Sequence, residues 1–299
     1  MPSSAANAGA SSETSAAVAA LPATLTEIRA GRSVAVHVRR NDAAKVRLVF
    51  VHGSCASMLP YRDVMEHFAA THEIVAFDHL GCGRSPKPRD WYAYRSSELT
   101  ADLAALLRRY ATTDKKNVVV AHSAGCSFSL AVAAEAPDLP LAGLCLLGAF
   151  HAERMPVHPV FYLPVFVLNL LQPTLSAGFE AVALHATTRQ GETAAHRSVR
   201  ALCAELNASN EMHMCKAYYR QLSVPSADAV RRVAAARLPV SLLVGEADAL
   251  IPRAATDALH ALLPEAEVRV IARASHQMMQ ENPTDVCAGV ADLVARATQ

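Results

Sequence analysis

Ser123 lies at a junction whose residue types suit a nucleophile. The residues Asn117–Ala121 form a continuous apolar run typical of a buried strand, and Cys126–Glu135 has helical character. Between them stands the pentapeptide Ala-His-Ser-Ala-Gly, which ends at Gly125 and begins with alanine in place of the usual glycine. A strand, a sharp turn and a helix around a serine predict a nucleophile elbow, where small neighbours relieve backbone crowding. The alternative role for Ser123 is that of a helix-capping serine.

A candidate acid and a candidate base follow in the order that serine hydrolases use. Asp248 comes after the strand-like run Leu238–Val244, and His276 comes after the run Glu267–Ile271. His276 can take a proton from a serine near neutral pH, and a carboxylate such as Asp248 can fix its tautomer. Because ligands gather at the carboxyl ends of parallel strands, we predict that these residues meet Ser123 there.

Neighbouring titratable residues offer competing assignments. Glu246 and Asp257 are the rivals of Asp248, although Asp257 falls in a predicted helix. Asp78, at the end of another strand-like run, is interpreted as shaping the loop Gly81–Ser85 rather than as a catalytic acid. His122 precedes the nucleophile, and the alternation of side chains along a strand predicts that it points away in a structural role.

Backbone N–H groups and apolar side chains complete the predicted site. The N–H groups of Ser54 and Ala124 are the expected oxyanion donors, since an oxyanion needs two preorganised partners. Four side chains are expected to line a substrate pocket: Cys55, Phe161, Phe166 and Met278. For Cys55 the alternative is a small buried apolar residue, and for Met278 it is a place in the core.

Strand-like and helical segments alternate along most of the chain. This alternation predicts an α/β fold with a mostly parallel central sheet flanked by helices, preceded by a hairpin within 25–40. The expected strands are Arg47–Val51, Glu73–Phe77, Asn117–Ala121, Leu141–Leu147, Leu238–Val244 and Glu267–Ile271. The expected helices include Ser97–Tyr110, Cys126–Glu135, Gln190–Asn207, Thr256–Leu263 and Thr284–Gln299.

The alternation of strand-like and helical segments is interrupted once, over residues 151–236, which contain no clear strand. We therefore predict a core domain of residues 24–150 and 237–299, a helical cap of residues 151–236 inserted between strands, and a disordered Ala/Ser-rich tail of residues 1–23. The apolar run Phe161–Leu171 is interrupted by Pro164 and is shorter than the roughly 20 residues of a membrane span, so no transmembrane span is expected. Contact of the cap with a membrane surface stays open.

Composition narrows the function classes. The 299 residues carry 28 basic and 27 acidic side chains. The chain therefore lacks the basic excess that is typical of proteins that bind nucleic acid. The seven cysteines form no C-x-x-C pair, which disfavours a disulfide framework and a zinc site. No motif suggests a metal or another cofactor. Residues 1–23 lack the features of a targeting signal, so we expect a cytoplasmic protein; a mitochondrial or membrane-associated location stays open.

Five segments together resemble the α/β-hydrolase fold superfamily over about residues 25–297. They are Val49–Ser54, Phe77–Ser85, Ala121–Gly125, Val244–Pro252 and Ala274–Pro283. Within the superfamily the chain is most similar to the α/β-hydrolase domain-containing proteins, and Leu163–Ala181 resembles the insertion of one of them. The resemblance implies a serine hydrolase acting on a small-molecule or lipid acyl substrate, that is an ester, a thioester or a lipid. The alternative is a catalytically silent protein that binds a hydrophobic ligand or a protein partner.

Overall fold

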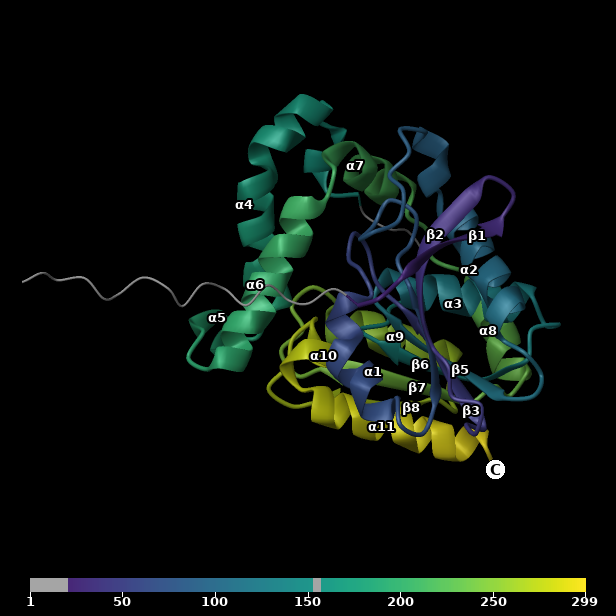
Figure 1. Cartoon of the computed structure of the whole chain (residues 1–299). Coiled ribbons are helices and arrows are strands. Elements are labelled where there is room, and N and C mark those ends of the chain that lie inside the picture. The colour runs from purple at the N-terminus through teal and green to yellow at the C-terminus, as the bar shows by residue number, and fades with distance from the viewer. Residues whose placement is uncertain (1–20, 153–156) are drawn as a thin grey trace, which may run out of the picture.

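An eight-stranded sheet forms the centre of the structure, a computed structural model that describes residues 21–152 and 157–299 (Figure 1). The strand order is β1-β2-β4-β3-β5-β6-β7-β8. Strand β2 pairs antiparallel with β1 and β4, and the remaining pairs are parallel. The strands are β1 Thr24–Arg29, β2 Arg32–Arg39, β3 Val46–Val51, β4 Glu73–Phe77, β5 Lys116–His122, β6 Leu141–Leu147, β7 Val240–Gly245 and β8 Glu267–Ile271. The predicted hairpin and mostly parallel sheet are confirmed.

The central strands are apolar on both sides because helices cover both faces of the sheet. All residues of β3 and β4 are buried, and β3 lies in register between its two parallel neighbours, with Val49 opposite Val75 and Val119. Continuous apolar runs of this kind are typical of strands in doubly covered parallel sheets. The sequence pattern located these strands to within two residues.

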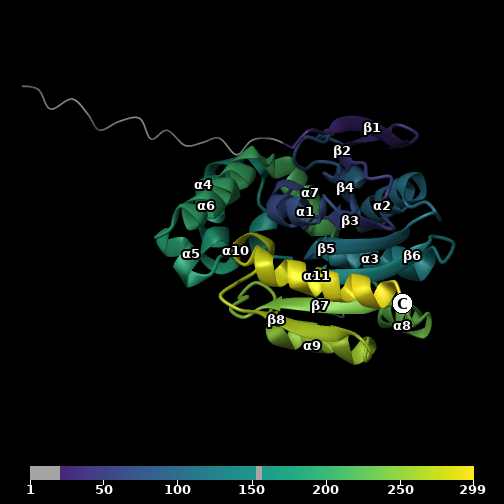
Figure 2. The same cartoon turned by 60° about the horizontal axis from the view of Figure 1, so that its bottom comes forward.

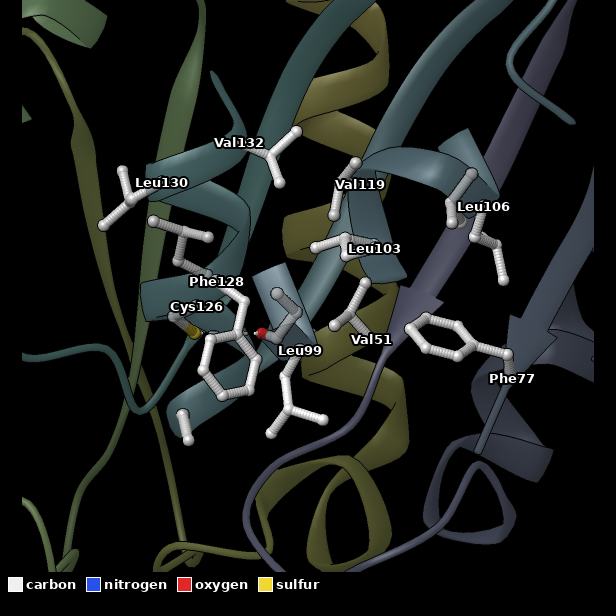
Figure 3. Close-up of a cluster of buried hydrophobic side chains, with 14 of the residues drawn as sticks. Val51, Phe77, Leu99, Leu103, Leu106, Val119, Cys126, Phe128, Leu130 and Val132 are labelled. Atoms are coloured by element: carbon white, nitrogen blue, oxygen red, sulfur yellow. Dashed lines mark hydrogen bonds between the residues drawn. The ribbon is translucent and has the colours of Figure 1, made fainter. Parts of the chain in front are cut away.

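Two groups of helices provide the two covers. Side chains of α2, α3, α8 and α9 share one buried cluster with the strands, part of which is shown in Figure 3. Side chains of α1 and α11 share the cluster on the opposite face, which α11 crosses in Figure 2. The helices of the two covers are α1 Arg62–Phe68, α2 Ser96–Tyr110, α3 Ala124–Glu135, α8 Ala227–Ala235, α9 Arg253–Leu262 and α11 Pro283–Ala297. Each fully buried leucine or phenylalanine in these clusters contributes about 1.5–3 kcal/mol through removal from water.

The cap lies beside the sheet, at the ends of the strands that carry the candidate site (Figure 1). Its elements are η3 Pro159–Tyr162, α4 Val165–Ala183, α5 Ala186–Gln190, α6 Ala194–Ser209 and α7 Met212–Gln221, and shorter elements elsewhere are η1 Leu59–Tyr61, η2 Trp91–Tyr94 and α10 Met278–Glu281. Hydrogen bonds join it to the core: Asn210 Nδ2 donates to the Cys55 carbonyl at 2.8 Å, and Gln277 N donates to the Ala183 carbonyl at 3.2 Å.

The structure moves two of the predicted domain boundaries. Helix α8 falls within the predicted cap, yet Val230 and Val233 are buried against the core, so the cap ends before this helix. Most of the predicted tail lies outside the described residues, but its last three residues pack on the fold. Leu21 is buried, and the Pro22 carbonyl lies 2.6 Å from Nδ1 of His37.

Helix α4 is longer than its sequence pattern suggested. The predicted run of about a dozen apolar residues ended at Leu171, whereas the helix continues through Pro173 to Ala183 and has 19 residues. A proline inside a helix removes one hydrogen bond and bends the helix without ending it here, and Figure 1 shows the ribbon bending along its length. By length and composition alone, α4 is the one described helix that could cross a membrane, and only 6% of its 18-residue apolar window is buried.

Candidate functional site

Ser123 occupies a strained turn between β5 and α3. Its φ of 53° and ψ of −123° lie outside the regions that side chains ordinarily favour. The turn is held from both sides: Ser123 N donates to the Leu147 carbonyl at 2.9 Å, and Cys126 N donates to the Ser123 carbonyl at 2.9 Å. A Cβ at Gly125 would lie 2.6 Å from the His52 carbonyl oxygen, so only glycine fits there. The predicted elbow geometry is therefore present.

Asp248 and His276 are brought into direct contact, as the sequence predicted. Nδ1 of His276 donates to Oδ2 of Asp248 at 2.9 Å, and both side chains are almost fully buried. Each residue stands on a loop that directly follows a strand, β7 for the aspartate and β8 for the histidine.

The rival carboxylates have other partners. Oε2 of Glu246 accepts a hydrogen bond from Arg273 N at 2.8 Å, on the exposed side of the loop. Asp257 lies in α9 and pairs with Arg253 at 2.7 Å. Asp78 accepts backbone hydrogen bonds from Met58 and Arg84 at 2.8 Å each, so its predicted role in shaping the loop is confirmed.

Asp248 is held in its charged form. Burial alone would raise its pKa, but the hydrogen bond and charge of His276, together with backbone N–H groups, lower the pKa below its ordinary value. Those N–H groups belong to Leu250 and Ile251, and both donate to Oδ1 at 2.9 Å. An ionised Asp248 keeps the proton on Nδ1 of His276, which leaves Nε2 free to accept a proton.

Ser123 and His276 are linked through their neighbours. Nε2 of His122 donates to the His276 carbonyl at 2.9 Å, and the two imidazole rings lie 4.5 Å apart. Gly148 follows the Leu147 carbonyl that Ser123 N contacts, and a Cβ on Gly148 would lie 3.2 Å from the His276 ring. His122 is structural, as predicted, but it reaches His276 rather than pointing away from the site. No pattern in the sequence indicated Gly148.

Burial of His122 makes the stability of the fold depend on pH. Burial, followed by the nearby charge of His276, lowers the pKa of His122 to about 3. An unfolded histidine titrates near 6.5, so between these values the unfolded chain binds more protons, and stability falls as pH falls.

We expect His122→Gln, which keeps a donor for the His276 carbonyl, to flatten the fall in unfolding free energy between pH 6 and pH 4.5 by about 1 kcal/mol per pH unit. Urea unfolding at several pH values measures this slope. An unchanged slope in the His122 variant would refute the assignment.

Of the two predicted oxyanion donors, Ala124 directly follows Ser123, and Ser54 follows a glycine that lies against Ser123. Ala124 N–H belongs to the first turn of α3, where backbone donors have no acceptor within the helix. Gly53 precedes Ser54 and lies so close to the nucleophile that a Cβ on it would be 2.9 Å from Cβ of Ser123. The loop is fixed by His52, whose Nδ1 lies 2.7 Å from the Gly53 carbonyl while Nε2 accepts a hydrogen bond from His79 N at 2.9 Å.

The structure places three of the four predicted pocket residues in different surroundings, and the fourth, Cys55, is described below. Phe161 is partly buried and stacks on Tyr219 of α7 with ring centroids 4.5 Å apart. Phe166 was wrongly predicted: it is 67% exposed on the outer side of α4. Met278 was also wrongly predicted, because it is fully buried in the cluster under α1 and α11. Neither outcome could be read from residue type alone.

Cys55 belongs to a buried thiol group rather than to a reactive centre. Its pKa is raised well above the ordinary value by the hydrogen bond with Cys215 and by burial. The thiol therefore stays protonated, which disfavours a reactive role, and Cys55 is partly buried against the core. All seven cysteines are free. Within residues 21–152 and 157–299, no group of three histidine, cysteine, aspartate or glutamate side chains could hold a metal ion.

Glu281 joins the cap to the loop of the candidate base, and no pattern in the sequence indicated this role. Its Oε1 accepts from His185 N and its Oε2 accepts from Ser275 N, each at 2.6 Å. Oγ of Ser275 adds hydrogen bonds to the Val182 and Ala247 carbonyls at 3.2 and 3.0 Å. The end of α4 is thus bonded to the residue that precedes His276.

Removal of the Glu281 carboxylate should loosen this junction. Glu281→Ala leaves two backbone N–H groups without their charged acceptor, and we expect the free energy of unfolding to fall by about 2–4 kcal/mol. Chemical denaturation measures the change. Glu265→Ala removes an exposed carboxylate and should change stability by less than about 0.5 kcal/mol. Equal losses in the two variants would show that the Glu281 contacts do not hold the cap.

Known proteins resemble this chain in sequence and in fold. A profile of the serine aminopeptidase S33 family matches residues 42–283. The chain is 31% identical to protein ABHD8 of Bos taurus over 246 residues, which cover 81% of this chain and 54% of ABHD8. It is 27% identical to the probable lysophospholipase BODYGUARD 2 of Arabidopsis thaliana over 127 residues, which cover 41% of this chain and 26% of that protein. The chain thus spans about half the length of the ABHD8 relatives it matches.

The solved structure of a putative aryl esterase from Burkholderia cenocepacia superposes with a TM-score of 0.76 at 22% identity, over 93% of this chain and 99% of that one. This likeness shows the α/β-hydrolase fold. The predicted resemblance to the α/β-hydrolase domain-containing proteins is confirmed by the match to ABHD8. With its fold, its strained elbow and the profile match over most of its length, the chain belongs to the serine aminopeptidase S33 family of α/β-hydrolases.

Proposed function

We propose that the protein is a serine hydrolase that cleaves a carboxylic ester, a thioester or a lipid acyl bond through an acyl-enzyme intermediate. The observation that carries the proposal is the buried pair of Asp248 and His276 at 2.9 Å, placed beside a serine in a strained elbow. Strain of this kind costs about 1–3 kcal/mol and persists where function requires it. A structural serine would gain nothing from this backbone conformation.

The proposed reaction uses each group at a defined atom. Nε2 of His276 takes the proton of Ser123 Oγ as the oxygen attacks the acyl carbonyl, and the oxyanion is stabilised by the N–H groups of Ser54 and Ala124. His276 then passes the proton to the leaving group, and the acyl group stays on Ser123. Water, deprotonated by His276, releases the acid and restores the serine. Asp248 stabilises the imidazolium in both halves of the reaction.

An apolar acyl group is the substrate that the surroundings favour. Phe161 and Tyr219 form a stacked aromatic pair within the cap, and the buried cluster around them is apolar. One relative carries the name of a probable lysophospholipase. A series of p-nitrophenyl esters from acetate to palmitate tests this proposal, and we expect kcat/KM to rise with chain length beyond butyrate. No turnover of any ester by folded protein would favour the catalytically silent alternative.

A further inference from the structure

The outer face of α4 has no charged side chain along its whole length. Phe166 and Leu170 are 67% and 77% exposed, one helical turn apart, and Tyr162 and Leu163 continue the same surface at the start of the helix. The exposed residues of α4 are Phe166, Asn169, Leu170, Pro173, Thr174, Ala177, Gly178, Ala181 and Val182. We call this surface the α4 face. Over 19 residues it is roughly 28 Å long, and a contiguous apolar surface of this size marks an interaction site.

The composition of the α4 face suits a lipid surface. Interfacial helices bury aromatic and aliphatic side chains at the boundary of the headgroups, with basic residues beside them. Two basic residues of α7 stand at the start of the face. The Arg220 guanidinium lies 4.1 Å above the Tyr162 ring, and Nζ of Lys216 donates to the Leu163 carbonyl at 2.7 Å. Tyrosine and cations in such pairs are enriched at the depth of phospholipid headgroups.

The charge nearest to the face is neutralised. Glu180 is the single acidic residue in α4, and its Oε1 accepts from Arg200 Nε at 2.6 Å on the side that packs on α6. A protein partner with a polar rim would find few hydrogen-bonding side chains on the face, which offers Asn169, Thr174 and, at its start, Tyr162. A bilayer needs none, because its interior forms no hydrogen bonds.

The contacts between α4 and the rest of the protein favour an α4 that lies on a membrane surface over an α4 that crosses the membrane. Leu168 and Ala183 are fully buried, so one side of the helix belongs to the protein core. The Ala183 carbonyl accepts from Gln277 N, and His185 N is bonded to Glu281. A transmembrane orientation would break these contacts, whereas surface contact preserves them. Figure 1 shows α4 at the outer edge of the cap, with α6 between it and the core.

We propose that the α4 face docks the protein on the surface of a glycerophospholipid bilayer, with Phe166 and Leu170 inserted and Lys216 and Arg220 at the phosphate groups. This inference goes beyond the proposed hydrolysis and does not depend on it. Docking would place the cap, and the loop of His276 bonded to it, next to the lipid phase.

Vesicle sedimentation tests the docking. The full chain is mixed with vesicles of phosphatidylcholine alone or with phosphatidylserine, and the bound fraction is measured by centrifugation. We expect wild type to bind, more tightly with phosphatidylserine, and Phe166→Glu with Leu170→Glu to reduce binding at least tenfold. Catalytically impaired Ser123→Ala should bind as wild type does, which separates docking from the proposed reaction.

A matched variant controls for added charge. Leu25→Glu with Val270→Glu makes the same change at two exposed apolar side chains on the edge strands β1 and β8, and it should bind vesicles normally. Circular dichroism and thermal unfolding check that each variant is folded. Equal loss of binding in the control would overturn the proposal. Wild-type protein that does not bind vesicles would also overturn it. If such a protein formed a dimer that only the α4 variant disrupts, the α4 face would be a contact between two copies of the chain instead.

Discussion

Ser123→Ala should lower kcat/KM for a p-nitrophenyl ester by about 10³- to 10⁶-fold while the protein stays folded. Without the hydroxyl no acyl-enzyme can form, and the pair of Asp248 and His276 has no nucleophile to activate. Steady-state kinetics on purified variants, with circular dichroism as the check on folding, measure the loss. A variant that retains more than a tenth of wild-type activity would contradict the assignment of Ser123.

Ser123→Gly provides a matched variant that separates chemistry from strain. It lacks the same hydroxyl, but glycine adopts positive φ without steric cost. We expect Ser123→Gly to be as inactive as Ser123→Ala and more stable than it by about 1 kcal/mol, since the strain of φ 53° is relieved. Thermal unfolding of the two variants compares them. If alanine were the more stable residue, the turn would not be strained.

Asp248→Asn should lower kcat/KM by about 10⁴-fold with little change in the fold. An amide in place of the carboxylate no longer stabilises the imidazolium, and its NH₂ group favours the wrong tautomer of His276. In the wild-type protein the backbone N–H groups of Leu250 and Ile251 donate to Oδ1, and the amide oxygen of asparagine can accept the same hydrogen bonds. Kinetics over a range of pH values measure the effect.

Glu246→Gln is the control for Asp248→Asn, because it changes a carboxylate two residues away that hydrogen-bonds Arg273 N instead of His276. We expect it to change kcat/KM by less than about threefold, in line with the small effects of substitutions away from the reacting atoms. If Glu246→Gln were the damaging substitution and Asp248→Asn were neutral, the acid would have been assigned to the wrong residue.

Structural features that depend on short, local stretches of sequence were predicted well. Strand β5, which ends just before Ser123, and its neighbours β3 and β6 are continuous apolar runs, and the small residues of the elbow follow from local crowding. Both features could be recognised without tertiary information. The order of serine, acid and histidine then predicted the contact between Asp248 and His276 across 28 residues. Local pattern and chain order sufficed because these residues stand at strand ends.

Features that depend on packing between distant segments were missed. Whether Phe166 faces a pocket or solvent depends on which side of α4 meets α6 and α7, and an apolar helix with a single charged residue near its end gives little indication of that side. Met278 shows the same ambiguity between core and pocket. The contacts of His122 with His276 and of Glu281 with His185 connect segments more than 90 residues apart, and the residue types alone indicate no partner.

Mass spectrometry of the protein after treatment with a fluorophosphonate tests the central claim most directly. The probe reacts only with a serine that a neighbouring base activates. We expect one phosphonyl adduct per chain, mapped by peptide fragmentation to Ser123, and no adduct in Ser123→Ala. An unmodified wild-type protein that is folded, or an adduct that persists in the alanine variant, would contradict the account of Ser123 as the nucleophile.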